Sequence, residues 1–130
     1  MEKKNMLDLM LERAEQSAQD KLKVLSIKSD VLGDIEIKIP PLKKLMEYID
    51  ESNSTETTYE DMLINAQMVY DCSDILKKNY SRLSEAYDEK DPATLTLKIF
   101  EAAEAVGEVN DIAQKIIEKA GLMRQTVKNS

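Results

Sequence analysis

The strongest constraint on the fold is a helical repeat in the middle of the chain, between Thr57 and Leu76. Apolar and small residues recur there at alternating steps of three and four, which places them on one side of an α-helix. Thr57 stands three residues before Glu60, the spacing of a capping box, in which each side chain satisfies a backbone N–H at the helix start. We therefore expect one helix from Thr57 to about Lys77, with the other segments packed on it. The repeat consists of Tyr59, Met62, Ala66, Val69, Ser73 and Leu76.

The residue totals exclude several classes of function. The chain has no histidine, so it contains no Ser–His or Cys–His catalytic pair and no histidine metal ligand. Its single cysteine, Cys72, is expected to be a buried or half-buried thiol rather than a nucleophile. The formal net charge of −7 argues against nucleic acid and anionic membranes as partners, because both attract clustered Lys and Arg. No long apolar run is present, and we expect a soluble, cytoplasmic protein.

The first 18 residues are typical of a short amphipathic helix that is rich in methionine. Leu7, Ala14 and Ala18 fall on one side, together with Met10 or Leu11. One interpretation is an arm that grips a partner, because methionine adapts to irregular surfaces. The favoured interpretation is a helix that docks on its own core or frays, as chain ends often do.

Two short β-rich runs follow between residues 21 and 39. Ile35, Ile37 and Ile39 alternate with charged residues, which is the period of a half-buried strand. Gly33 lies in the intervening loop and can take a positive φ. We predict a β-hairpin with a loop of four or five residues. Two strands alone are marginally stable, so the hairpin must pack on helices or pair with another chain.

Proline and glycine mark the boundaries of the later helices. Pro41 is expected to open a helix that ends near Asp50, followed by a polar loop to Thr57. Asp91 precedes a proline and has the character of a helix N-cap. Gly107 interrupts a longer apolar repeat, which favours two helices over one. These patterns, with a short helical turn near residues 81–87 and a C-cap at Gly121, complete the predicted helices.

The predicted fold is mainly α. We expect a single-domain helical bundle of about five helices over residues 1–122, with a small N-terminal β-hairpin near residues 21–39. Residues 123–130 are mostly polar and are expected to form a flexible C-terminal tail.

Acidic residues near the end of the chain line up on one side of the predicted helices. A carboxylate-bridged metal site in a bundle needs such a row, but normally with histidine ligands. Because histidine is absent, we expect a solvated face, with no metal and no other cofactor. The row is Glu101, Glu104, Glu108 and Asp111.

A partner-binding surface is expected on the helix after Pro41 and on the central helix. Apolar and tyrosine side chains on these helices have the chemistry of interface anchors, although tyrosines also lie commonly at the edge of a core. The predicted partner-binding residues are Leu42, Leu45, Met46, Ile49, Tyr59, Met62 and Tyr70.

Several short stretches occur in a fixed order between about residues 20 and 122. They are Ile39-Pro40-Pro41-Leu42, Tyr59-Glu60 with Ala66 and Val69-Tyr70, Leu83-Ser84-Glu85-Ala86-Tyr87, Asp91-Pro92, and Gly107-Glu108-Val109 leading into Ile112-Ala113-Gln114-Lys115-Ile116 and Gly121-Leu122. In this order and spacing they resemble the XkdN-like tail assembly chaperones of tailed bacteriophages and prophages.

The resemblance implies a small, non-catalytic protein, made in the cytoplasm of the bacterial host during virion assembly and absent from the mature virion. Such proteins are thought to hold the tape measure protein soluble and to help tail tube subunits gather around it. The alternative is an acidic adaptor or inhibitor module that binds another folded protein. An enzyme that uses carboxylates alone is disfavoured, and homo-oligomerisation is left open.

Overall fold

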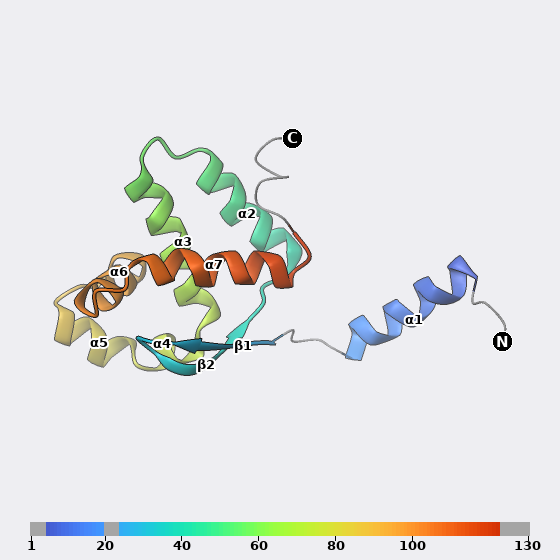
Figure 1. Cartoon of the computed structure of the whole chain (residues 1–130), viewed down its shortest axis with the longest axis horizontal. Helices are drawn as coiled ribbons and strands as arrows, with labels where there is room; N and C mark the ends of the chain where they lie inside the picture. The colour runs from blue at the N-terminus through green and yellow to red at the C-terminus, as the bar shows by residue number, and fades with distance from the viewer. Residues whose placement is uncertain (1–4, 20–23, 123–130) are drawn as a thin grey trace.

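The computed structural model describes residues 5–19 and 24–122, which form a mainly helical structure with a two-stranded antiparallel sheet (Figure 1). The predicted fold class is confirmed, although this part of the chain holds seven helices rather than about five. The predicted C-terminal tail lies outside the described residues. The elements in chain order are α1 (Met6–Gln19), β1 (Val24–Ser29), β2 (Gly33–Lys38), α2 (Leu42–Asn53), α3 (Thr58–Cys72), α4 (Asp74–Lys78), α5 (Tyr80–Tyr87), α6 (Pro92–Ala102) and α7 (Gly107–Lys119).

Helix α3 is the centre of the molecule, as the repeat predicted. It packs against α2, α6 and α7 and also touches β2 (Figure 1). Its start is capped by Thr57, whose Oγ1 accepts a hydrogen bond from the backbone N–H of Glu60 at 3.1 Å. The Glu60 carboxylate accepts from the N–H of Glu56 at 3.4 Å. The two side chains therefore satisfy two backbone donors at the helix start, one residue offset from a standard capping box.

The prediction of one continuous helix to about Lys77 is wrong, because the chain leaves the helical conformation at Ser73. Ser73 has φ −107° and ψ 109° and forms an isolated antiparallel bridge with Ile37 of β2. Its Oγ accepts from the N–H of Leu76 at 3.4 Å and so caps the new helix, α4. A pairing with a residue far away in the sequence thus overrides a helical pattern that is intact locally.

The predicted β-hairpin is confirmed. Ile27 pairs with Ile35, and both are buried, as is Ile37 on the same strand as Ile35. The Oγ of Ser29 accepts hydrogen bonds from the backbone N–H groups of Val31 and Leu32 in the turn, at 3.1 and 2.9 Å. Gly33 has φ +78°, the conformation that glycine adopts without strain. The turn outside the two strands spans residues 30–32, shorter than the expected four or five residues.

Helix α2 begins after Pro41 as predicted but extends beyond Asp50 to Asn53. The polar residues 51–53 complete its last turn, and Ser54 then donates from both its N–H and its Oγ to the carbonyl of Asp50, at 3.1 and 2.9 Å. Apolar periodicity did not indicate this turn, because it lies on the surface and carries no core residue.

The predicted break at Gly107 is also confirmed, since α6 ends at Ala102 and α7 begins at Gly107. The chain turns after α6 at Glu104, which has φ +55°. The backbone N–H of Ala105 then donates to the carbonyl of Phe100 at 2.9 Å. Helix α7 ends just before Gly121, the predicted glycine cap. Gly121 has φ +85°, and the N–H of Leu122 bonds to the carbonyl of Ile117 at 3.0 Å.

The core forms where α2, α3, α6, α7 and one face of the hairpin meet. It combines branched aliphatic side chains with a single phenylalanine, and its largest members are almost completely removed from solvent. The largest fully buried apolar side chains are Phe100, Ile37, Leu45, Ile49, Met68, Leu95, Ile112, Ile116, Ile117, Val69 and Val109.

Candidate functional site

The predicted partner-binding face of α2 is divided between core and surface. Leu45 and Ile49 are 0% and 1% exposed and belong to the core. Met46 is half-buried and packs on the core edge. Leu42 is 61% exposed at the start of the helix. As folded, α2 therefore offers a partner mainly Leu42, with part of Met46.

The predicted residues of α3 lie along the helix in different surroundings. Tyr59 is 59% exposed at its start, whereas Met62 is half-buried against the core. Tyr70 packs edge-to-face on Tyr80, with ring centroids 6.2 Å apart, and burial raises its pKa. Because α2 and α3 form a helical hairpin (Figure 1), the exposed residues Leu42 and Tyr59 lie at its opposite ends. The seven predicted residues do not form one continuous patch.

Part of the predicted acidic row lines a hollow of about 480 Å³ between the hairpin and the start of α7. Glu104, Glu108 and Asp111 face it together with Asp30, and the lysines Lys28 and Lys115 lie at the same hollow. Glu101 is exposed and is not part of the lining. One carboxylate oxygen of Glu108 is shielded from solvent and lacks a hydrogen-bond partner. Among residues 5–19 and 24–122, no group of three or more Cys, Asp or Glu side chains is arranged to hold a metal ion.

A smaller hollow lies between β2 and α4 and carries charges of both signs. Lys38 forms an ion pair with Asp74 at 2.8 Å, and this hydrogen bond holds the pKa of the Asp74 carboxyl below its usual value. Ile75 is 46% exposed beside this pair. The ion pair joins the hairpin to α4, and in it the charges of Lys38 and Asp74 compensate each other.

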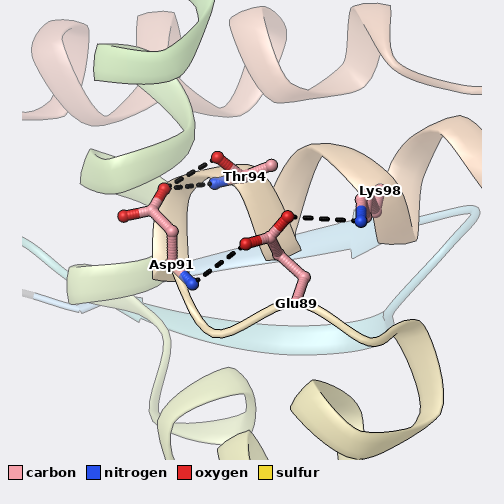
Figure 2. Close-up of polar contacts among 4 residues, drawn as sticks. All are labelled: Glu89, Asp91, Thr94 and Lys98. Atoms are coloured by element: carbon pink, nitrogen blue, oxygen red, sulfur yellow. Dashed lines mark hydrogen bonds and ion pairs between the residues drawn. The ribbon is translucent and has the colours of Figure 1, made fainter.

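The polar cluster at the start of α6 has a structural explanation (Figure 2). The Asp91 carboxylate accepts from the N–H and the Oγ1 of Thr94, at 3.0 and 2.8 Å. Glu89 accepts from the N–H of Asp91 at 3.2 Å and pairs with Lys98 at 3.2 Å, and these contacts hold the Glu89 pKa below its usual value. The cluster caps a helix, as Asp91 was predicted to do, and its groups satisfy one another.

Cys72 is buried as predicted, at 4% exposure. Burial, together with the negative charge of Asp71, raises the pKa of the thiol from 9.0 to about 12. The carboxylate of Asp71 accepts hydrogen bonds from Tyr48 Oη and, at 2.9 Å, from Gln67 Nε2. Burial and Asp71 also raise the pKa of Tyr48. A thiol held in the neutral form beside a carboxylate is a poor nucleophile.

Helix α1 presents the largest group of exposed apolar side chains. It lies apart from the other elements (Figure 1), and none of its described side chains, those of residues 6–16, contributes to the core. Asn5 caps it by accepting from the N–H of Asp8 at 2.8 Å. The seven predicted partner-binding residues do not include this helix, although its methionine-rich amphipathic pattern allowed the interpretation of an arm that grips a partner. Its exposed apolar residues are Met6, Leu7, Leu9, Met10 and Leu11, at 77%, 59%, 39%, 52% and 56% exposure.

In the described part of the chain, no helix combines the length and the apolar character needed to cross a membrane. Comparison of the chain with protein-family models, curated proteins and solved structures found no match. The resemblance to XkdN-like tail assembly chaperones therefore stays a prediction from the sequence, and the description of candidate sites depends on the fold and on the exposed face of α1.

Proposed function

We propose that this chain is a non-catalytic tail assembly chaperone that binds the tape measure protein and assists assembly of the tail tube. The observation that carries the proposal is the exposed apolar face of α1, since a run of large apolar side chains at this exposure is typical of a protein-binding surface. The sequence resemblance supplies the class of partner, a long protein that must stay soluble until the tail tube surrounds it.

The state of the polar side chains supports a binding role rather than catalysis. Cys72 is buried with a raised thiol pKa, and both oxygens of Asp71 are engaged by neighbouring side chains. Asp91 caps α6, and Glu89 accepts a hydrogen bond from the backbone N–H of Asp91. Catalytic acids and bases need access to a substrate and a pKa suited to proton transfer, and none of these groups combines the two.

The overall charge suits the same role. A formal net charge of −7 on 130 residues keeps a small protein soluble through mutual repulsion. A chaperone that holds an insoluble partner must supply this repulsion to the complex.

Coexpression tests the proposal directly. The chain is produced together with the tape measure protein of the same phage or prophage, and the soluble fraction of that protein is measured with and without it. We expect the soluble fraction to rise and the two proteins to copurify. An unchanged soluble fraction with no copurification would overturn the proposal. Capture of a different, folded protein with no effect on the tape measure protein would favour the adaptor alternative instead.

A further inference from the structure

Four of the five exposed apolar side chains of α1 lie on one side of the helix. Met6 and Met10 are four residues apart, and so are Leu7 and Leu11, so the four share one face. Each is more than half exposed. Two of the four are methionines, whose unbranched side chains repack easily against partners of different shape.

A helix of this size needs a packing partner. Fourteen residues span about 21 Å, and isolated helices shorter than about 12–15 residues are marginal in water. Packing of an amphipathic face normally supplies the missing stability. The core formed by the described residues lies between Ile27 and Ile117 and includes none of the α1 side chains from residues 6–16. Among the described elements, none therefore covers this apolar face, which stays open to a partner molecule.

The charges of α1 identify the chemistry of that molecule. Asp8 and Glu15 lie seven residues apart along one border of the apolar face, beside Leu11, and Glu12 lies next to them on the polar side of the helix. The opposite border holds Arg13. Three acids against one base leave the helix acidic, and a partner helix with Lys or Arg along its matching border gains opposite-charge contacts there.

A second copy of α1 fits this face poorly. In an antiparallel pair the acidic border of one copy faces the acidic border of the other, which is repulsive. In a parallel pair each acidic border faces a single arginine, Arg13, and the two helices together remain strongly acidic. Charge thus opposes self-association and favours a basic partner.

From these observations we infer that α1 is the docking element of this protein, and that it binds an amphipathic helix whose apolar face is bordered by Lys or Arg. The inference rests on the proposed function and names the surface and the partner chemistry. In this interpretation the buried residues Leu45 and Ile49 stabilise the core and do not contact the partner.

The experiment uses the full-length protein and a synthetic amphipathic helical peptide with leucine on one face and lysine along its borders. A second peptide replaces lysine with glutamate, and a scrambled lysine peptide keeps the composition but destroys the apolar face. Binding is measured by fluorescence anisotropy. We expect the lysine peptide to bind at least about tenfold more tightly than either control. Equal binding of the glutamate or scrambled peptide would overturn the inference.

Matched variants locate the site. Leu7→Ser/Leu11→Ser removes two leucines of α1, and Leu42→Ser removes a leucine of similar exposure from α2. The α1 variant should weaken binding of the lysine peptide at least about tenfold, and Leu42→Ser should change it less than about twofold. Circular dichroism and thermal unfolding check that both variants fold. Equal losses in both variants, or none in the α1 variant, would place the site elsewhere.

Two further measurements separate the possible failures. A dimer in sedimentation that Leu7→Ser/Leu11→Ser abolishes would show that a second copy covers α1 and would overturn the inference. If the α1 variant loses the peptide but still solubilises the tape measure protein, the docking inference fails and the proposed function stands. If the wild type binds the lysine peptide through α1 but leaves the tape measure protein insoluble, the proposed function fails and α1 remains the docking element for another basic helix.

Discussion

Helices α1, with 14 residues, and α6, with 11, both carry large apolar side chains but have opposite surroundings. Leu95 and Phe100 of α6 are 1% and 0% exposed, whereas Met6 and Leu11 of α1 are 77% and 56% exposed. Both helices begin with a side-chain cap, from Asp91 in α6 and from Asn5 in α1. Local signals therefore start both helices in the same way, and tertiary packing distinguishes them.

The comparison teaches that a periodic apolar face predicts a helix but does not identify what covers it. α6 packs against α3, α5 and α7, so its face belongs to the folding core. The face of α1 has no such cover among the described elements. A substitution in α6 should therefore act on stability, and a substitution in α1 should act on binding.

The largest expected loss of stability comes from a substitution in α6, the helix whose apolar face is covered. Phe100→Ala removes a completely buried aromatic ring and leaves a cavity, which should lower the free energy of unfolding by about 3–5 kcal/mol. Urea denaturation followed by circular dichroism measures the loss. A change below about 1 kcal/mol would mean that α6 is less tightly packed than its burial indicates.

The next effect is a loss of stability at alkaline pH. The folded protein raises the pKa of the Cys72 thiol from 9.0 to about 12, so folding favours the neutral thiol. This contribution is complete below pH 9 and is lost as the pH rises toward 12, by at most about 1.4 kcal/mol per pH unit.

Unfolding free energies measured between pH 8 and 11 should fall more steeply for the wild type than for Cys72→Ala. The raised pKa values of Tyr48 and Tyr70 act in the same direction in both proteins, so the difference between the curves reports the thiol together with the smaller effect that Cys72 has on the pKa of Tyr48. If the unfolding free energies of the two proteins fell equally with pH, the raised pKa of Cys72 would be contradicted.

The N-cap of α6 should contribute less to the stability of the protein than the core residues of the same helix. Asp91→Ala removes the acceptor for the N–H of Thr94 and should lower the free energy of unfolding by about 1 kcal/mol. Asp91→Asn is the matched control, because asparagine caps helices about as well as aspartate. Thermal unfolding of the two variants measures the difference, and equal destabilisation by both would point to the carboxylate charge instead of the cap.

The smallest effect on stability is expected in α1. Leu7→Ser/Leu11→Ser should change the free energy of unfolding of the remaining fold by less than about 0.5 kcal/mol, because these side chains are exposed. Urea denaturation of the variant and the wild type tests this. A loss comparable to that of Phe100→Ala would erase the contrast between the helices and show that α1 packs on the core in solution.

Local chemistry predicted most of the fold. Thr57, Asp91, Gly107 and Gly121 each lie at a helix end, and Gly33 has the positive φ expected of the hairpin turn. These residues act on their immediate neighbours, so their effects can be inferred from a few positions of sequence.

The two larger failures involve contacts between distant segments, whereas the errors in the end of α2 and in the length of the hairpin turn are local. The bridge between Ser73 and Ile37 divides a helix whose local pattern is continuous. Among the partner-binding residues, periodicity placed Leu45 and Ile49 on the same face as Leu42 but could not indicate that the first two face the protein's own core. Deciding between a core and an interface requires knowing which other segment covers the face.

The bridge at Ser73 also bears on how the molecule unfolds. An isolated two-stranded ribbon has little stability of its own, yet here its second strand holds the junction of α3 and α4 through one backbone pairing and the contact between Lys38 and Asp74. The hairpin and the helices consequently stabilise each other, because unfolding of either one removes contacts that support the other. We therefore expect residues 24–122 to unfold in a single cooperative step.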